Sequence, residues 1–350
     1  MKKRIVFVYA LVHFIVDLAC AILVNRLVSP NIDNSLILFT SVLIYNFFAF
    51  AMQLPIGIIA DKVNRNAICS ATGCLLVAFA YLFSQNGIIA CLVAGIGNAM
   101  FHVGGGIDVL NISDKKASLS GIFVSTGAMG IFLGSTPKFT EFNQYYILVI
   151  SVIISAILLF YLYQKIKDEV KNAELIIPEL DKSEKLIVVC LMITVVIRSY
   201  MGLILAFDWK SDLFLAFISI LAVVFGKMFG GIIGDKIGFS KISIISLVIS
   251  SILFIFAFDN CFLGVLAILF FNMTMPITLT ALSNILFYNK GMAFGLLTFA
   301  LFLGALPVFF GYGNILFTQS GLFLITIISA IILYIGMRKY NKIMENKNDF

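Results

Sequence analysis

The sequence has few charged residues, few prolines and only two histidines, and these shortages limit what the chain can be. Charged residues make up 12% of its 350 residues, against about 25% in a soluble domain. Hydrophobic residues make up 61%, and apolar stretches of membrane-spanning length recur along the whole chain. No polar segment is long enough for a sizeable domain outside a membrane, so a nucleic-acid-binding or nucleotide-binding domain is excluded. The net charge of +6 therefore indicates membrane topology.

The six cysteines form no CxxC pair, and none stands near a histidine at the spacing of a metal site. They lie scattered in or beside apolar stretches, at Cys20, Cys69, Cys74, Cys91, Cys190 and Cys261. We interpret them as packing thiols. The sequence therefore predicts no disulfide framework, no metal site and no cofactor.

The hydropathy pattern predicts an all-α membrane protein with twelve transmembrane helices in two six-helix bundles. A helix needs about 20 mostly apolar residues to cross the bilayer, and 350/12 leaves roughly 29 for each span and its turn. The predicted helices are 5–27, 35–60, 67–84, 87–110, 117–136, 144–164, 186–207, 211–234, 241–258, 261–287, 291–313 and 319–337. The predicted domains are a bundle over 1–164, a cytoplasmic linker over 165–185, a second bundle over 186–337 and a cytoplasmic tail over 338–350.

The distribution of lysine and arginine predicts the orientation, because these residues stay on the cytoplasmic side. With the N-terminus inside, 19 of the 24 lie in cytoplasmic segments and two (Arg198 and Lys227) lie within spans. The outer loops hold the other three, Arg26, Lys138 and Lys210. We therefore expect a multi-pass protein of the cell membrane with both termini in the cytoplasm.

An internal repeat relates the two halves. Residues 57–62 read Gly-Ile-Ile-Ala-Asp-Lys and residues 231–236 read Gly-Ile-Ile-Gly-Asp-Lys, each where a second helix turns into a third. Phe101 to Pro137 also aligns without gaps to Phe271 to Pro307. Paired halves with a site at their interface near the midplane are typical of alternating-access transporters.

The repeated loop resembles the signature of the major facilitator superfamily, a Gly-x-x-x-Asp-Arg/Lys-x-Gly-Arg pattern between the second and third helices. The first copy has Asn64 where glycine is usual, and Asn tolerates a left-handed backbone better than most residues. The second copy keeps Asp235, Lys236 and Gly238 but has Phe239 in place of the usual arginine. The layout of the whole chain is similar to that superfamily.

Three shorter stretches resemble the fosmidomycin-resistance branch of the superfamily, which exports drugs. They are His13-Phe14-x-x-Asp17 in the first helix, Gly97 to His102 in the fourth and Arg198-Ser199 in the seventh.

The resemblance implies that Asp61 engages the eleventh helix and acts as a conformational latch. The residues to which we assign gating are Gly57, Asp61, Lys62, Arg65, Gly231, Asp235 and Lys236. The alternative is a positively charged anchor with a tight turn. The occurrence of the pattern in both halves favours the latch.

Ionisable residues inside the membrane are costly and are functional candidates by default. The candidates are His13, Asp17, His102, Asp108, Arg198 and Lys227. His13 and Asp17 stand four residues apart on one helical face. We predict proton coupling at Asp17, with His13 and His102 as modulators, and the alternative is an interhelical pair that never titrates. Asp108 is expected to pair with Lys115, Arg65 or water.

Arg198 keeps its charge and has a planar fork suited to a carboxylate, phosphate or phosphonate. It is predicted either to bind an anionic substrate or to pair with Asp17 across the halves. Asn98, His102, Tyr200 and Asn272 are further candidates for substrate contacts, or interhelical packing residues.

Together these features favour a monomeric secondary transporter for small amphipathic or anionic compounds, with protons, the substrate and the lipid bilayer as its partners. Export coupled to protons follows from the branch resemblance. Uptake or facilitated diffusion of an anionic metabolite is the alternative. An enzyme within the membrane, with His13, Asp17 and His102 as ligands or acid–base groups, fits less well, because it does not need the paired loops and no HExxH motif is present. A channel fits less well because it would not need the paired loops either.

Overall fold

The computed structural model describes residues 2–136, 145–166, 172 and 179–348, and these residues contain twelve helices long and apolar enough to cross a membrane. Twelve spans and an all-helical fold were predicted, and both are confirmed. Pro137, Lys138 and most of the predicted linker 165–185 lie outside the described residues.

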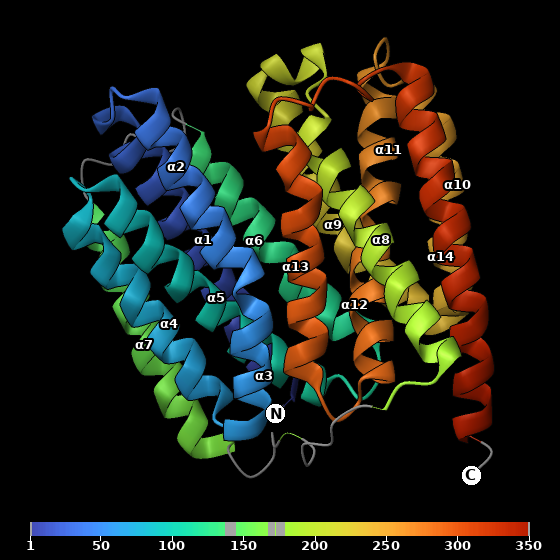
Figure 1. Cartoon of the computed structure of the whole chain (residues 1–350), viewed down its shortest axis with the longest axis horizontal. Helices are drawn as coiled ribbons and strands as arrows, with labels where there is room; N and C mark the ends of the chain where they lie inside the picture. The colour runs from blue at the N-terminus through green and yellow to red at the C-terminus, as the bar shows by residue number, and fades with distance from the viewer. Residues whose placement is uncertain (1, 137–144, 167–171, 173–178, 349–350) are drawn as a thin grey trace. The chain divides into compact units, whose positions relative to one another are not determined.

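The elements follow the predicted order along the chain (Figure 1). In the N-terminal half they are α1 (Lys2–Ile22), η1 (Leu23–Val28), η2 (Ser29–Asn31), α2 (Ser35–Asn46), η3 (Phe47–Ala51), α3 (Gln53–Val63), α4 (Asn66–Ala80), η4 (Tyr81–Phe83), α5 (Gly87–Ile112), α6 (Ala117–Ser135) and α7 (Tyr145–Ile166). In the C-terminal half they are α8 (Lys182–Ile204), η6 (Asp208–Ser211), α9 (Leu213–Ile237), α10 (Phe239–Phe256), α11 (Cys261–Asn272), α12 (Thr274–Ile285), α13 (Lys290–Phe309) and α14 (Gln319–Asn348).

Two spans that the sequence predicts as single helices are interrupted, and a proline accounts for each interruption. A proline removes one backbone donor and clashes with the carbonyl four residues earlier. Pro276 stands four residues after Asn272, where α11 ends and α12 begins. Pro55 stands four residues after Ala51, where the π-helical turn η3 ends before α3. Each of the two spans is still long and apolar enough to cross a membrane, with an irregular turn near its middle.

The chain forms two compact units that depart from a simple division of the sequence into halves. The first unit comprises Met1–Asp114, Phe123–Leu175 and Tyr288–Phe299. The second comprises Lys115–Ile122, Ile176–Phe287 and Ala300–Phe350. The start of α13 thus packs with the N-terminal helices, and the start of α6 packs with the C-terminal helices.

Close packing of α4 against α5 organises the first unit. Gly104 faces the α4 backbone, where an added Cβ would overlap the carbonyl of Asn66 and the side chain of Ser70. Gly97 faces Gly73 in the same way, one glycine against another. Because no side chain separates the two helices there, α5 lies deep in the unit and its other faces reach α1 and α13.

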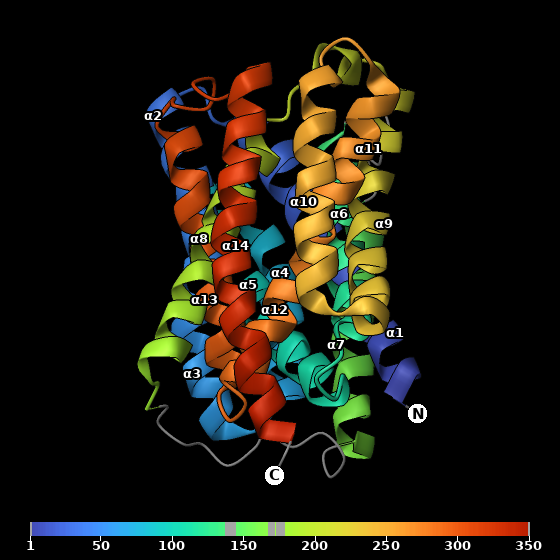
Figure 2. The same cartoon turned by 90° about the vertical axis from the view of Figure 1, so that its right-hand side faces the viewer.

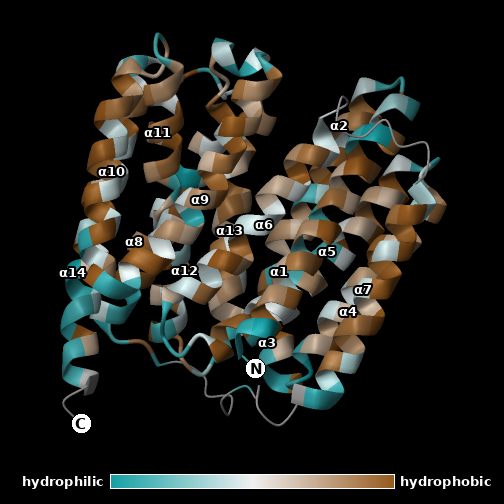
Figure 3. Ribbon diagram, turned by 180° about the vertical axis from the view of Figure 1, so that it is seen from behind, coloured by the Kyte–Doolittle hydropathy of each residue, from teal (hydrophilic) through white to brown (hydrophobic). Residues whose placement is uncertain are grey.

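In the second unit, α14 packs beside α8 and α10, and α11 packs beside α9 and α10 (Figure 2). Hydrophobic residues cover the middle of the helices in both units, and hydrophilic residues gather at the helix ends and in the connections (Figure 3). Large apolar side chains, such as Ile154 and Ile157 of α7 and Ile328 of α14, are exposed on outer faces. This distribution suits a protein whose outer surface contacts lipid.

Candidate functional site

The loops after α3 and α9 show why the repeated loop motif has Asn64 in one copy and Gly238 in the other. Asn64, at the end of α3, has a φ of 52°, in the left-handed region that the sequence analysis expected it to tolerate. Gly238, its counterpart after α9, has a φ of 98°. Both residues let the chain reverse directly into the next helix.

Asp61 accepts two backbone hydrogen bonds at the start of α13. The Gly291 nitrogen donates to Oδ1 at 2.8 Å, and the Met292 nitrogen donates to Oδ2 at 2.9 Å. A carboxylate is favourable here because the first N–H groups of a helix lack partners and carry partial positive charge. Since α13 is the eleventh span, the contact is the one that the resemblance implies for Asp61.

Asp235 makes the equivalent contact in the second unit. Its Oδ1 accepts from the Ala117 nitrogen at 2.7 Å and its Oδ2 accepts from the Ser118 nitrogen at 3.0 Å, both at the start of α6. The repeated motif therefore builds the same carboxylate-to-helix contact twice. We call these two contacts the Asp61 latch and the Asp235 latch, after the role predicted for these residues, which stays a prediction.

A glycine one turn before each carboxylate lets the helices approach. A Cβ on Gly57 would overlap the Gly291 carbonyl, and a Cβ on Gly231 would overlap the Ala117 carbonyl. The predicted gating residues Lys62, Arg65 and Lys236 have exposed side chains. Their roles in gating stay a prediction.

Four buried or half-buried polar residues meet between α1 and α5 in the first unit. They are His13, Asp17, Asn98 and His102, and we call them the polar cluster. Asp17 Oδ2 lies 3.1 Å from His13 Nε2, and its Oδ1 lies 3.6 Å from His102 Nε2. The Asn98 amide donates to the same Oδ1 at 3.0 Å, and the two Nε2 atoms lie 2.8 Å apart. The structure thus brings together the three residues predicted for proton coupling.

The surroundings of the polar cluster exclude most water. His13 and Asp17 are buried, and the rings of Phe101 and Phe123 lie against His13 with centroids 5.9 and 4.7 Å away. Gly127 of α6 faces the pair, because a Cβ there would overlap both Asp17 Oδ2 and His13 Nε2.

The polar cluster also offers a set of metal ligands. His13, Asp17 and His102 each present one ligand atom, and all three atoms lie within 4.8 Å of one another. The sequence predicted no metal site because no cysteine stands near a histidine at the spacing of such a site, and these three residues were considered as ligands only for the less favoured enzyme.

Asp108 has two hydrogen-bond partners in the first unit that the sequence analysis did not name. It accepts a hydrogen bond from the Tyr9 hydroxyl at 2.5 Å and one from the Asn66 amide at 2.8 Å. Tyr9 stands one turn before His13 on α1, so two buried carboxylates line the contact between α1 and α5. Tyr9 and Asn66 were missed because the search singled out residues whose charge is costly to bury in a membrane, and these two side chains are neutral.

Arg198 lies buried in the second unit, where its Nη1 donates to the hydroxyls of Thr278 at 3.2 Å and Thr274 at 3.5 Å. Among the described residues of that unit, no carboxylate lies within ion-pair distance of it. The two threonines belong to α12, which follows the break in the tenth span. Pairing with Asp17 concerns a residue of the other unit and stays a prediction.

The remaining candidates make local contacts. The Tyr200 hydroxyl donates to the Tyr312 and Gly313 carbonyls at 3.0 and 3.3 Å, in the connection after α13. The Asn272 amide donates to the Ile268 carbonyl of its own helix at 2.8 Å. Their substrate contacts stay a prediction.

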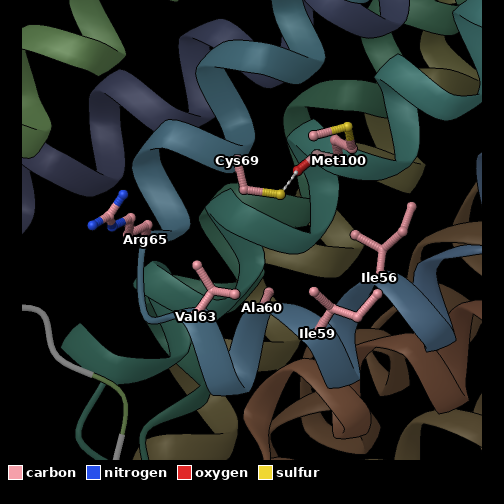
Figure 4. A pocket seen from close by; sticks show the side chains of 7 residues that line it. All are labelled: Ile56, Ile59, Ala60, Val63, Arg65, Cys69 and Met100. Atoms are coloured by element: carbon pink, nitrogen blue, oxygen red, sulfur yellow. Dashed lines mark hydrogen bonds between the residues drawn. The ribbon is translucent and has the colours of Figure 1, made fainter.

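An apolar pocket of about 240 Å³ lies at α3, α4 and α5 (Figure 4). Its lining residues are Ile56, Ile59, Ala60, Val63, Arg65, Cys69 and Met100. The Cys69 thiol donates to the Met100 carbonyl at 3.4 Å. No residue of the polar cluster lines this pocket. The volume of the pocket is therefore no evidence about the polar cluster.

Comparison with known proteins gives a consistent result for the fold alone. No protein family and no curated protein matches this sequence. Among solved structures, the chain is similar to FucP, described as a major facilitator superfamily transporter in the outward conformation, and to a variant of that protein, described as the E. coli fucose:proton symporter. Each comparison has a TM-score of 0.65 and 12% identity, and covers 95% of this chain and 98% of the other.

The human organic anion transporter MFSD10 (TETRAN) is similar to the same degree, with a TM-score of 0.65 and 12% identity over 96% of this chain and 99% of its own. These likenesses extend over nearly the full length of both partners. The chain therefore has the fold of the major facilitator superfamily transporters.

Proposed function

We propose that this protein is a secondary active transporter that moves small amphipathic or anionic compounds by alternating access, coupled to protons. The observation that carries the proposal is the pair of latches, in which each repeat places an equivalent aspartate against the start of another helix. Such a contact can form in one state and open in the other without covalent chemistry. Repeated halves that alternate in this way are the basis of alternating access.

Arg198 supports an anionic group on the substrate. A buried guanidinium held only by two threonine hydroxyls in its own unit keeps hydrogen-bonding capacity for a carboxylate, phosphate or phosphonate. The similarity to an organic anion transporter agrees with this class.

The polar cluster supports proton coupling. A buried carboxylate flanked by two imidazoles can take up and release a proton as the site opens to either side of the membrane. We assign Asp17 the central role, with His13 and His102 beside it. Asn98, Tyr200 and Asn272 are proposed to complete the substrate contacts.

Export is the direction that the resemblance to the fosmidomycin-resistance branch supports. Uptake is the second candidate, because one similar structure is described as a fucose:proton symporter. An enzyme or a channel is less well supported, because neither function requires the two latches. We further propose a monomer in the cell membrane with both termini in the cytoplasm.

Transport in proteoliposomes tests the proposal. The purified chain is reconstituted, a pH gradient is imposed, and a panel of amphipathic and anionic solutes is assayed for accumulation. We expect at least one solute to accumulate in vesicles with the wild-type protein and only to equilibrate in vesicles with Asp17→Asn. Transport of that solute should be lost in Arg198→Ala. The exposed residues Asp259 and Arg338 provide matched controls as Asp259→Asn and Arg338→Ala.

Gradient-driven accumulation that persists in Asp17→Asn would remove the coupling role from Asp17. The absence of accumulation for every solute in both directions would contradict secondary transport itself.

A further inference from the structure

The hydrogen bonds of the two histidines determine where their protons lie. His13 Nδ1 is 2.7 Å from the Phe123 carbonyl, and His102 Nδ1 is 2.9 Å from the Asn98 carbonyl. A carbonyl oxygen only accepts, so both Nδ1 atoms must be the donors. In a neutral imidazole the other nitrogen is then an acceptor, and both Nε2 lone pairs are free to bind a cation.

These two lone pairs and a carboxylate converge on one place. The Nε2 atoms are 2.8 Å apart, and Asp17 oxygens lie 3.1 and 3.6 Å from them. Three acceptors cannot stay this close without positive charge between them. A proton on His13 Nε2 can point at His102 Nε2 or at Asp17 Oδ2, whereas one metal ion would bind all three residues at once.

The distances fit a tetrahedral transition-metal site. Zinc binds nitrogen and oxygen ligands at about 2.0–2.2 Å, which places neighbouring ligand atoms about 3.3–3.5 Å apart. The histidine Nε2 atoms lie 2.8 Å apart, and they face different oxygens of Asp17, with His13 Nε2 3.1 Å from Oδ2 and His102 Nε2 3.6 Å from Oδ1. With one ligand atom taken from each residue, the three atoms lie within 4.8 Å of one another. Small side-chain shifts would bring all three atoms to bonding distance, with a fourth position left for water or another ligand.

The neighbours hold the ligands as a metal site requires. Metal-binding histidines almost always donate their second nitrogen to a carbonyl or carboxylate, and both histidines do so here. Asn98 orients two ligands at once, through its carbonyl to His102 and its amide to Asp17. Gly127 leaves the face beside Asp17 and His13 without a side chain.

We propose that His13, Asp17 and His102 form a binding site for one divalent transition-metal ion of the zinc class. The set of two imidazoles and one carboxylate suits Zn²⁺ and Co²⁺ better than Mg²⁺ or Ca²⁺, which prefer oxygen ligands. His102, with 13% of its side chain exposed, is the most accessible ligand. The site goes beyond the proposed transport function, and its geometry does not depend on that function.

Metal titration of the purified full-length chain tests the site. Zn²⁺ is titrated by calorimetry and Co²⁺ by visible absorption, with the protein in detergent micelles. We expect one ion per chain and the strong visible bands of tetrahedral Co²⁺. The chain has only two histidines, so a histidine-bound metal can lie nowhere else.

Variants assign the ligands. His102→Ala and Asp17→Asn should each weaken binding at least 100-fold, and Asn98→Ala should weaken it about 10–100-fold, as loss of an orienting residue does. Asp108→Asn is the matched control, because it removes a buried carboxylate of the same helix that bonds Tyr9 and Asn66. It should bind metal as wild type does.

Failure of wild type to bind, or unchanged binding in both ligand variants, would overturn the proposal. Near-ultraviolet absorption bands typical of a cobalt–thiolate bond would also overturn it, because they would show that the ion binds to cysteines. This measurement needs only the wild-type protein. Transport by a chain that binds no metal would refute this site alone. Metal binding by a chain that transports nothing would refute the proposed function alone.

Discussion

The two latches are built by the same motif but differ in their surroundings. Each places a carboxylate one turn after a glycine and binds two N–H groups at the start of another helix. Asp61 is 4% exposed, whereas Asp235 is half-buried. A buried hydrogen-bonded carboxylate loses more when its contact is broken, because its partners have less access to water.

The residues that follow each motif widen this difference. Asn172 donates from its amide to the Ala60 carbonyl at 3.0 Å and from its backbone to Asn64 at 2.8 Å, and so adds a segment to the end of α3. After α9, Phe239 stands where the first copy has Arg65, and its ring stacks on Tyr340 of α14 with centroids 6.3 Å apart. The comparison indicates that duplicated motifs keep their central contact while their neighbours diverge.

The largest effect is expected from Asp61→Asn. The asparagine side chain has one oxygen that can still accept a hydrogen bond from α13, but its NH₂ group faces the other backbone N–H. One of the two charge-assisted hydrogen bonds is therefore lost, and the other is weakened because the acceptor is now neutral. Such bonds contribute about 1.5–3 kcal/mol each, which corresponds to a loss in transport rate of about tenfold or more. Initial rates in proteoliposomes measure it, with protein content and gel-filtration profile matched to wild type. Normal turnover would show that the Asp61 latch has no role in the cycle.

A slightly smaller effect is expected from Gly57→Ala. The added methyl would overlap the Gly291 carbonyl and force α3 away from α13, lowering transport about tenfold. The control is Gly202→Ala in α8, where an added Cβ meets no atom within 4 Å and transport should be unchanged. Equal rates in the two variants would mean that close approach at Gly57 is dispensable.

Asp235→Asn is expected to lower transport only about threefold. The lost hydrogen bonds are the same as for Asp61→Asn, but the half-buried site lets water replace part of them. Measuring both variants in one preparation sharpens the comparison directly. If Asp235→Asn were as damaging as Asp61→Asn, burial could not explain the difference between the latches.

Asn172→Ala should have the smallest effect, a loss of less than about twofold in transport and of about 1–2 °C in melting temperature. It removes the amide hydrogen bond to Ala60 and those shared with Asn66 and Asn111, worth about 1 kcal/mol together after exchange with water. Glu179→Ala, an exposed change in the same connection, provides the control. If the melting curves of Asn172→Ala and wild type coincided, the hydrogen bonds of Asn172 would not contribute to the stability of the region around the Asp61 latch.

Much of the fold could be predicted because its signals are local in the chain. Twelve apolar stretches predicted twelve spans, and the repeated Gly-Ile-Ile motif predicted two equivalent loops. The breaks at Ala51 and Asn272 were missed, although Pro55 and Pro276 were available as signals four residues later. Hydropathy averages over a window, so it detects that a span exists and overlooks one irregular turn within it.

The site was predicted in part. The cost of burying charge singled out His13, Asp17, His102 and Arg198 one by one. Their partners were less accessible to this reasoning, because Tyr9, Thr274 and Thr278 are common residues of apolar helices.

The sequence alone determined the number of spans, the duplication and the two carboxylates of the latches, since hydropathy and motif spacing depend only on order along the chain. The tertiary structure decided which acceptors converge at Asp17 and which hydroxyls hold Arg198. Those contacts depend on how each helix is rotated and how closely its glycines let it approach its neighbours. Such quantities arise only when helices distant in sequence pack together.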